Sequence, residues 1–454
     1  MSFFLFVLVV SSLACGTLPP ADVSLGRAAF ASLGMLAGWT LLFHLAARTL
    51  ARQVLLGHLD SSVATRWLER QLALLRWLGL GAAVFCLAGF GVARGLDQQP
   101  PFRDWMVCKA AVCLTPGLVI CFAAWSAEND FGMRLGWRER SVRGHLRSLA
   151  MAFRDGAAWM VVPVLLLLAG FDLIGWIGSG WPEADGLPIQ SAAAAFLLVA
   201  TLVVTPRLMG CVFKTRPLEP ELGEWIGRVL AAAGVGSPRV LCWDTGRRSW
   251  NALVVGLLGR FRIVLVSDRV LDELPRDQLA MVLLHEAAHI RRRHAALRMA
   301  LLLPVWGLAW SVTVLSEPHE WAAVLGTVTG ITLAAGLLHW VAHRTESDAD
   351  SVACRIAPGV AAGVPGVPAS ADAAAESLGA ALIRVTAGSP AARERSWLHP
   401  SLDQRLASLR SLAESLAQDR PATGRRHRIG RFTRCPAWLI LGRRGSDPLR
   451  TIAE

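Results

Sequence analysis

The chain has 454 residues, of which 54% are hydrophobic and only 18% are charged, and its mean hydropathy is +0.44. Soluble globular proteins average about 25% charged residues, so this composition excludes an ordinary soluble protein and indicates a protein embedded in a lipid bilayer. The formal net charge of +12 does not indicate a nucleic-acid partner, because the arginines concentrate in loops between apolar runs and not on a soluble module.

Apolar runs of about twenty residues, long enough to cross a bilayer, follow one another along the chain. They lie at residues 28–47, 72–95, 105–126, 157–179, 189–213, 297–316 and 322–343, and a shorter run lies at residues 2–16. The short run lacks the positively charged start of a signal peptide, although Ser12-Leu13-Ala14-Cys15 resembles a lipoprotein cleavage site. We interpret it as an uncleaved first helix, which makes eight predicted crossings, about six of them before residue 214.

The arginines cluster in alternate connections between these runs. One connection carries Arg48, Arg52, Arg66 and Arg70, and another carries Arg134, Arg138, Arg140, Arg143, Arg147 and Arg154. The intervening connections, near residues 97–104, 181–185 and 317–320, are short and neutral or acidic. Because cytoplasmic loops are enriched in Lys and Arg, eight crossings place both termini and the segment between residues 214 and 296 on the cytoplasmic side.

From Lys214 the composition becomes that of a soluble protein. Residues 222–233 have the apolar period of an amphipathic helix, residues 239–243 form a short apolar run, and residues 260–267 are rich in β-branched side chains. These segments predict a helix and a small β-sheet. Residues 271–284 contain Pro275 near a helix start and then apolar residues at helical spacing, so the segment that follows the sheet is predicted to be a helix.

This helix carries His285-Glu286-Ala287-Ala288-His289. Two histidines four residues apart project from one face of a helix, so both rings can bind one zinc ion while Glu286 stands beside the metal. An open zinc position lowers the pKa of bound water, and a neighbouring carboxylate takes its proton as the water attacks a peptide carbonyl. Burying two histidines and a carboxylate without a metal would be costly, so the motif predicts a zinc peptidase.

A third metal ligand is required, and Glu346 is the best candidate because two imidazoles and one carboxylate leave a coordination position open. Asp350, one helical turn further, is expected to accept a hydrogen bond from the non-ligating nitrogen of a zinc histidine. The predicted membrane hairpin at residues 297–343 separates Glu346 from the two histidines. The metal would therefore join the ends of both membrane helices, at the membrane surface.

The remainder of the chain is less regular. Residues 358–374 are rich in Ala, Gly and Pro and predict a flexible segment, whereas residues 375–387 and 402–416 return to helical period. The tail after residue 416 is basic and is expected on anionic headgroups or disordered. We thus expect an N-terminal membrane region at 1–213, a zinc peptidase domain at 214–416 interrupted by the hairpin, and a basic tail at 417–454.

These motifs resemble peptidase family M48, the membrane zinc peptidases that include the CAAX prenyl proteases and the bacterial heat-shock membrane protease. The resemblance spans about Trp250 to Leu409. It is carried by Trp250-Asn251-Ala252 before an apolar strand, His285-Glu286-Ala287-Ala288-His289 followed by Ile-Arg-Arg-Arg-His, Glu346-Ser-Asp-Ala-Asp350, and His399-Pro400 six residues before Arg405. It implies an α-helical multi-pass membrane protein with a mostly helical, zincin-like (gluzincin) catalytic domain that carries a small β-sheet.

The resemblance also implies roles for residues that spacing alone does not reveal. Asn251, Ala252 and the strand after them would hold an extended peptide by backbone hydrogen bonds. His399 would stabilise the tetrahedral oxyanion and Arg405 would support the site. Ser347-Asp348 replaces the aromatic or apolar residues usual after the third ligand, and the N-terminal helices are more numerous than in commoner members, which leaves the choice of substrate open.

The predicted function is that of an integral membrane zinc endopeptidase that cuts membrane-associated polypeptides at the cytoplasmic face of a bacterial cytoplasmic membrane, with Glu286 as general base and His285, His289 and Glu346 as Zn²⁺ ligands. One alternative is a sensor peptidase of the M56 group. Another is a non-catalytic scaffold in which zinc only joins helices, although a structural zinc needs no general base and has a fourth protein ligand. The sequence leaves the oligomeric state open.

Overall fold

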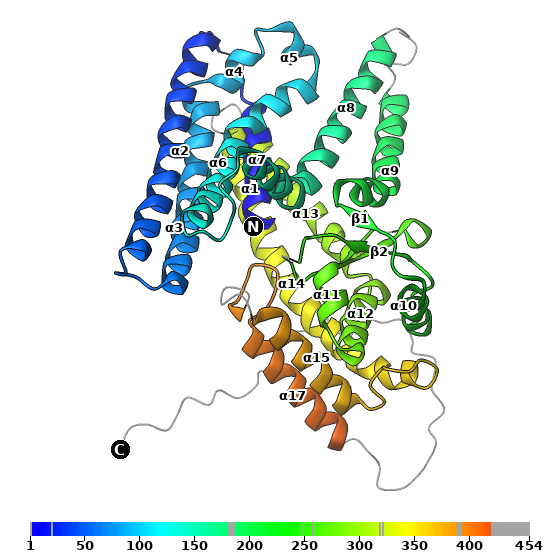
Figure 1. Ribbon diagram of the computed structural model, residues 1–454. Coiled ribbons are helices and arrows are strands. Elements are labelled where there is room, and N and C mark those ends of the chain that lie inside the picture. Colours follow the sequence, from blue (N-terminus) through cyan, green and yellow to red (C-terminus); the bar gives the residue numbers. More distant parts are fainter. Residues whose placement is uncertain are drawn as a thin grey trace, which may run out of the picture.

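The computed structural model describes residues 2–418 except 20, 180–186, 248, 257, 317–318, 320–321 and 388–392. The fold is mostly helical, with one small four-stranded sheet, and it extends from a group of long helices at one end to a compact helical region at the other (Figure 1). The expected fold class, a helical multi-pass membrane protein with a small sheet in its second half, is confirmed. The predicted basic tail lies outside the described residues from 419 onward.

The described residues between Ser2 and Val212 are mostly helical. The helices are α1 (Ser2–Gly16), α2 (Leu25–Leu55), α3 (Ser61–Val84), α4 (Val92–Leu96), α5 (Pro100–Asp104), α6 (Met106–Arg134), α7 (Val142–Phe153), α8 (Trp159–Ser179) and α9 (Leu187–Val212). Across the described residues, seven helical stretches are long and apolar enough to span a membrane, and α1 is a shorter apolar helix. The seven long runs predicted from sequence are thus helices, and the crossing by α1 stays a prediction.

Helices α1, α2, α3 and α6 form a bundle whose centre is apolar. Phe43 of α2 and Ile120 of α6 are fully buried in it. Helix α1 lies directly on α6, because Gly117 has no side chain: a Cβ atom there would come within 2.7 Å of Leu8. Asp172 of α8 accepts hydrogen bonds from the first backbone N–H groups of α6, so this acidic residue in an apolar run caps a helix.

The sheet follows α9. Its strands are β1 (Thr215–Arg216), β2 (Arg239–Trp243), β3 (Ala252–Val255) and β4 (Ile263–Ser267), in the order β1-β2-β4-β3. Strand β4 pairs in parallel with β2 and antiparallel with β3. All residues of β4 are buried because Leu265 packs against α9 while Val264 and Val266 face the helical core. The predicted strands at residues 239–243 and 260–267 are therefore present, and β3 is an edge strand.

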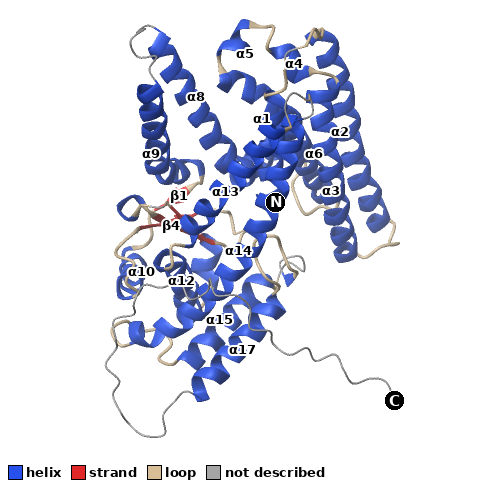
Figure 2. Ribbon diagram, turned by 180° about the vertical axis from the view of Figure 1, so that it is seen from behind, coloured by secondary structure: helices blue, strands red, loops and turns tan. Residues whose placement is uncertain are grey.

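The remaining helices surround the segment from His285 to His289. They are α10 (Pro220–Ala232), α11 (Asp268–Glu273), α12 (Arg276–Arg291), α13 (His294–Leu315), α14 (Ala322–Ala361), α15 (Ala371–Thr386) and α17 (Leu402–Gln418). Helices α13 and α14 pair as the predicted hairpin, and α14 continues as a single 40-residue helix from the hairpin into the core. Figure 2 shows from behind how α14 joins the long helices to the region of α12, α15 and α17.

One prediction for this region is wrong. Residues 358–374, expected to be flexible from their Ala, Gly and Pro content, include the last turn of α14, and the connection after it carries Val364 and Val367, both buried. The physical reason is that these valines and Val360 belong to the same apolar core as α12 and α15. Burial of apolar side chains against neighbouring helices outweighs the weak helical preference of the local sequence.

Candidate metal centre

Helix α12 presents the two histidines of the motif on one side. Its apolar residues Leu279, Leu283 and Leu284 are buried in the core, which fixes the rotation of the helix about its axis. His285 and His289, four residues apart, then point to the same side, and their Nε2 atoms lie 3.2 Å from each other. The structure therefore places the two rings as the spacing predicts.

Glu346 of α14 completes the group. Its Oε2 lies 3.5 Å from His285 Nε2 and its Oε1 lies 3.4 Å from His289 Nε2. The fully buried alanines Ala287 and Ala288 of α12, and Ala349 of α14, let these two helices approach closely. Tertiary packing of α12 on α14 thus brings together ligands that are about sixty residues apart in the chain.

The donor set and its spacing fit a zinc ion. Two imidazole nitrogens and one carboxylate oxygen are typical zinc donors, and bonds of about 2.0–2.2 Å in a tetrahedron put donors about 3.3–3.6 Å apart. The two Nε2 atoms are 3.2 Å apart, His285 Nε2 is 3.5 Å from Glu346 Oε2, and His289 Nε2 is 3.4 Å from Glu346 Oε1. One ligand atom from each residue can be chosen so that all three lie within 4.8 Å of one another. Among the described residues no fourth His, Cys, Asp or Glu side chain joins this group, so the arrangement is that of an open site.

Asp350 supports the first ligand. Its Oδ1 lies 2.8 Å from His285 Nδ1, which is an ion-pair distance although the approach departs from strict hydrogen-bond angles. The other side of Asp350 is held by Arg405 of α17, whose Nε and Nη2 lie 2.8 and 2.6 Å from the two carboxylate oxygens. Asp350 thus lies where a carboxylate would orient His285, and Arg405 contacts Asp350 and not the ligands.

The local electrostatics suit the binding of a cation. Burial opposes a charge on His285, but its contacts with Asp350 and Glu346 outweigh that effect and raise the His285 pKa to about 10. A metal ion at this position would replace that proton. Burial raises the pKa of Glu286 to about 7, so this carboxylate is set to accept and release a proton near neutral pH. Burial also lowers the pKa of His289 and favours its neutral, metal-binding form.

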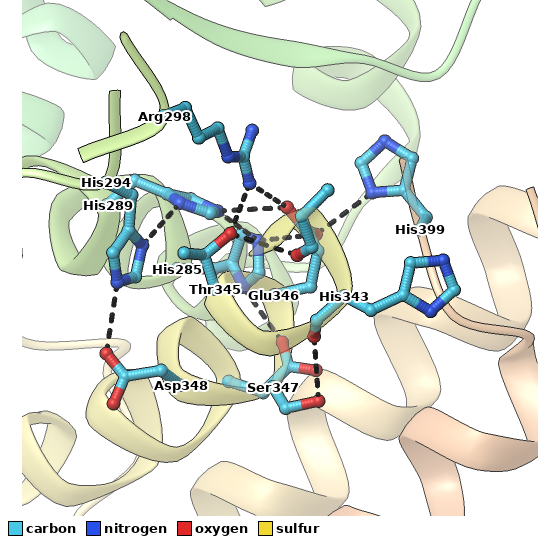
Figure 3. Close-up of polar contacts among 12 residues, drawn as sticks. His285, His289, His294, Arg298, His343, Thr345, Glu346, Ser347, Asp348 and His399 are labelled. Atoms are coloured by element: carbon cyan, nitrogen blue, oxygen red, sulfur yellow. Dashed lines mark hydrogen bonds and ion pairs between the residues drawn. The ribbon is translucent and has the colours of Figure 1, made fainter. Parts of the chain in front are cut away.

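His399 lies on the open side of the group. Its Nδ1 is 3.0 Å from Glu346 Oε2, while 57% of its side chain remains exposed (Figure 3). The residue was expected to stabilise an oxyanion. Its position beside the third ligand and open to solvent is compatible with that role, which stays a prediction.

The segment that carries His399 is fixed on α14. His339 Nδ1 lies 2.8 Å from the carbonyl oxygen of Trp397, and His343 Nε2 lies 3.1 Å from that of Ser396. The Trp397 indole donates to the carbonyl of α14 residue 335 at 3.2 Å and its ring stacks on Phe3 of α1, with centroids 4.4 Å apart. The polar His339 in a membrane run is therefore explained by this anchoring, and α1 contacts the peptidase region.

Asn251 and Ala252 lie at the start of β3. Asn251 N donates to Ser267 Oγ at 3.1 Å, and Ser267 N donates to Asn251 O at 2.9 Å. Strand β3 has β4 on one side, and its other edge carries no strand in the described part of the chain. Such an edge can accept an extended peptide, and the substrate-binding role of these residues stays a prediction.

Sequence reasoning missed several residues that surround the ligands. His294 lies between His289 and Asp348, and Arg298 of α13 donates hydrogen bonds to Thr345 and to Glu346 Oε1 (Figure 3). Residues 290–294 were used only as part of the family resemblance, and Asp348 only as a departure from the family pattern. The sequence does contain a third histidine, His294, five residues after His289. In a continuous helix that spacing would turn His294 away from the face that carries His285 and His289.

Comparison with known proteins agrees with this geometry. Residues 218–413 match the family model for Peptidase family M48. Three relatives, each named "Protease HtpX homolog", align with the chain. That of Syntrophobacter fumaroxidans is 25% identical over 174 residues, covering 36% of this chain and 57% of the relative. The relative from Aeropyrum pernix is 26% identical over 180 residues, which cover 37% of this chain and 54% of the relative. The relative from Salinibacter ruber is 29% identical over 141 residues, which cover 31% of this chain and 49% of the relative.

The chain spans about half the length of these curated relatives. Among solved structures, the crystal structure of S. mikatae Ste24p aligns over 86% of this chain and 99% of its own, with 18% identity and a TM-score of 0.44.

Proposed function

We propose that this chain, whose residues 218–413 belong to peptidase family M48, is an integral membrane zinc endopeptidase that cuts membrane-associated polypeptides. One observation carries the proposal: His285, His289 and Glu346 bring three ligand atoms within 4.8 Å of one another, and Glu286 adjoins the first of them. The printed names of the relatives, which are proteases, support the same reaction class.

The residues divide the chemistry between them. A zinc ion held by His285, His289 and Glu346 would supply a Lewis acid that lowers the pKa of water and polarises the peptide carbonyl. Glu286, whose pKa is raised by burial, takes the proton of the attacking water and delivers it to the leaving amine. His399, from the open side of the site, donates a hydrogen bond to the oxyanion that develops on the carbonyl oxygen.

The substrate is proposed to bind as an added strand. The free edge of β3, beginning at Asn251 and Ala252, offers backbone groups to an extended peptide. Exposed apolar side chains of α13, such as Trp306 and Leu303, are expected to contact lipid, and α13 begins at His294, beside the metal ligand His289. A polypeptide that is anchored in or emerges from the bilayer would reach both surfaces, which supports membrane-associated substrates.

The active site is proposed to face the cytoplasm. The turn between α2 and α3, which adjoins Arg48, Arg52, Arg66 and Arg70, points to the same end of the molecule as α12, α15 and α17, while α4 and α5 lie at the opposite end (Figure 1). Because Lys and Arg are enriched in cytoplasmic loops, this distribution supports a cytoplasmic peptidase region.

Two alternatives receive less support. A structural zinc joining helices would have a fourth protein ligand, and none joins the group among the described residues. For a sensor peptidase of the M56 group, the family match offers no support, because residues 218–413 match M48.

The test compares the parent with Glu286→Gln, purified in detergent, on a panel of quenched-fluorescence membrane-protein substrates. Glutamine keeps the shape of the side chain but cannot act as the base, so both proteins should bind zinc in equal amount while only the parent cleaves, with a loss of at least about 100-fold in the variant. Equal cleavage by both proteins would refute the role of Glu286. Zinc in both without any cleavage by the parent would favour the structural zinc, and a parent without zinc would refute the metal site.

A further inference from the structure

A chain of polar side chains continues from the second metal ligand away from the site. His289 Nδ1 lies 2.8 Å from His294 Nδ1, and His294 Nε2 lies 3.1 Å from Asp348 Oδ2 (Figure 3). Asp348 in turn accepts from Arg292, whose Nε and Nη2 lie 2.8 and 3.3 Å from its oxygens. His294 is 4% exposed, so it is a buried polar residue with both ring nitrogens occupied.

The positions of the nitrogens permit only one arrangement of protons when a metal is bound. His289 turns Nε2 toward His285 and Glu346, so Nε2 must be unprotonated to bind the ion and the proton must reside on Nδ1. His289 Nδ1–H therefore donates, and His294 Nδ1 must accept. The proton of neutral His294 is then on Nε2, where it points at the Asp348 carboxylate. In this arrangement His289 donates to His294, and His294 donates to Asp348.

The backbone is shaped to make this contact. In a continuous helix, residues five apart lie about 140° apart around the axis and cannot touch. Here α12 ends at Arg291, and Arg293 adopts a left-handed conformation with φ 54° before α13 begins at His294. This conformation is unfavourable for a residue other than glycine, and it returns the chain so that His294 meets the ring of His289.

The two zinc histidines are thus supported differently. His285 faces Asp350 directly, whereas His289 reaches Asp348 through an interposed imidazole. Asp348 and Asp350 are two residues apart on α14, about 200° around the helix, so they lie on nearly opposite sides and cannot support the same ligand. Asp348, which departs from the family pattern, contacts His294 on its own side of α14.

We propose that His294 is the positioning residue of the metal ligand His289, and that Asp348, held by Arg292, fixes the tautomer of His294 that accepts its hydrogen bond. The inference rests on the proposed zinc site. It extends the site by three residues, whose function is to hold His289 as a neutral Nε2 ligand aimed at the ion. Partners of this kind strengthen metal binding by about 10–100-fold in zinc sites.

The test measures zinc affinity in full-length protein in detergent by competition with a fluorescent chelator. The informative pair is His294→Leu and His294→Asn. The two side chains have nearly the same shape, but only asparagine presents an oxygen where His294 Nδ1 accepts. We expect His294→Leu to weaken zinc binding by about 10–100-fold and His294→Asn to recover most of that loss. Ser347→Ala, on the same turn of α14 and exposed, is the matched control and should leave the affinity unchanged.

A second comparison tests the rest of the chain. Asp348→Leu should weaken zinc binding in the parent background but have little further effect in His294→Leu, because both substitutions interrupt the same chain. Thermal unfolding of the metal-free proteins distinguishes a general loss of folding from a loss of metal binding: the melting temperatures of the Leu and Asn variants without metal should be similar.

The outcomes separate this proposal from the proposed function. If the parent does not bind zinc, the metal site itself is refuted. If the parent binds zinc and His294→Leu binds it equally tightly, only the positioning role fails. Equal weakening by Leu and Asn would also overturn the proposal, because it would show that the volume of the ring matters and its acceptor nitrogen does not.

Discussion

Glu346 is the residue on which the polar contacts of the site converge. It faces both histidines of the motif, accepts a hydrogen bond from Arg298 and lies 3.0 Å from His399 Nδ1. A buried carboxylate is costly unless it is paired, and Glu346, 3% exposed, has these four side chains as partners for its two oxygens. The same contacts hold one oxygen of Glu346 beside each histidine, and one ligand atom from each of the three residues lies within 4.8 Å of the other two.

The pair of Asp350 with Arg405 gives a prediction at this scale. Both side chains are largely buried and joined by two short contacts. Asp350→Asn leaves the Arg405 charge without its partner, and breaking a buried pair costs about 3–5 kcal/mol. We expect a marked loss of stability in denaturant unfolding, together with weaker zinc binding because His285 loses its support. Asp272→Asn, which removes an exposed pair with Arg247, should change stability little; similar effects in both variants would contradict the assigned role of Asp350.

At the scale of elements, α14 connects the membrane to the chemistry. Its first part pairs with α13 in the hairpin, its middle binds the segment that carries His399, and its last turns carry Glu346, Asp350 and part of the peptidase core. A helix holds all of these at fixed rotation and rise. Displacement of α14 along its axis would therefore move a metal ligand and the His399 segment together.

A substitution at Trp397 tests whether catalysis depends on the anchoring of the segment that carries His399. Trp397→Ala removes the stack on Phe3 and the hydrogen bond to residue 335 of α14, which loosens the segment beside Glu346. Because His399 is proposed to act on the developing oxyanion, we expect kcat to fall by roughly 10–100-fold while zinc content stays that of the parent. Trp340→Ala, an exposed tryptophan on α14, is the control. A drop in zinc content, or an unchanged kcat, would count against the assigned function of this segment.

At the scale of the whole molecule, helices α12, α15 and α17 lie toward one end, the sheet lies near the middle, and the connection through α4 and α5 lies at the other end. The Arg-rich turn between α2 and α3 lies at the end of the peptidase region. One orientation in the bilayer therefore accounts both for the charge distribution and for the position of the site.

Thiol labelling of whole cells tests that orientation. With the native cysteines replaced, His58→Cys in the α2–α3 turn should react with a membrane-impermeant thiol reagent only after the cells are opened, because the proposed orientation puts this turn on the cytoplasmic side. Gln99→Cys, in the connection between α4 and α5, should react in intact cells. Both positions are exposed, so accessibility within the protein is matched. The reverse pattern would place the site outside the cytoplasm.

The sequence by itself determined the features that depend on local spacing. Apolar runs long enough to cross a bilayer predicted the positions of the long helices. The four-residue interval between His285 and His289 predicted that both rings lie on one face of a helix, because this spacing is close to one helical turn. It also allowed Glu346 and Asp350 to be named, since carboxylates one turn apart resemble a known pattern. The segment after α14 was misjudged, because composition does not reveal which valines a neighbouring helix will cover.

Only the tertiary structure decided which partners meet. Close packing of α12 on α14 through small residues sets the distance between the histidines and Glu346. The left-handed turn at Arg293 brings His294 to His289, against the expectation of a continuous helix. The His399 segment depends on contacts with α14 and with Phe3, far away in the chain. Local periodicity specifies the direction of each side chain, but contacts across sixty or more residues depend on the packing of whole helices.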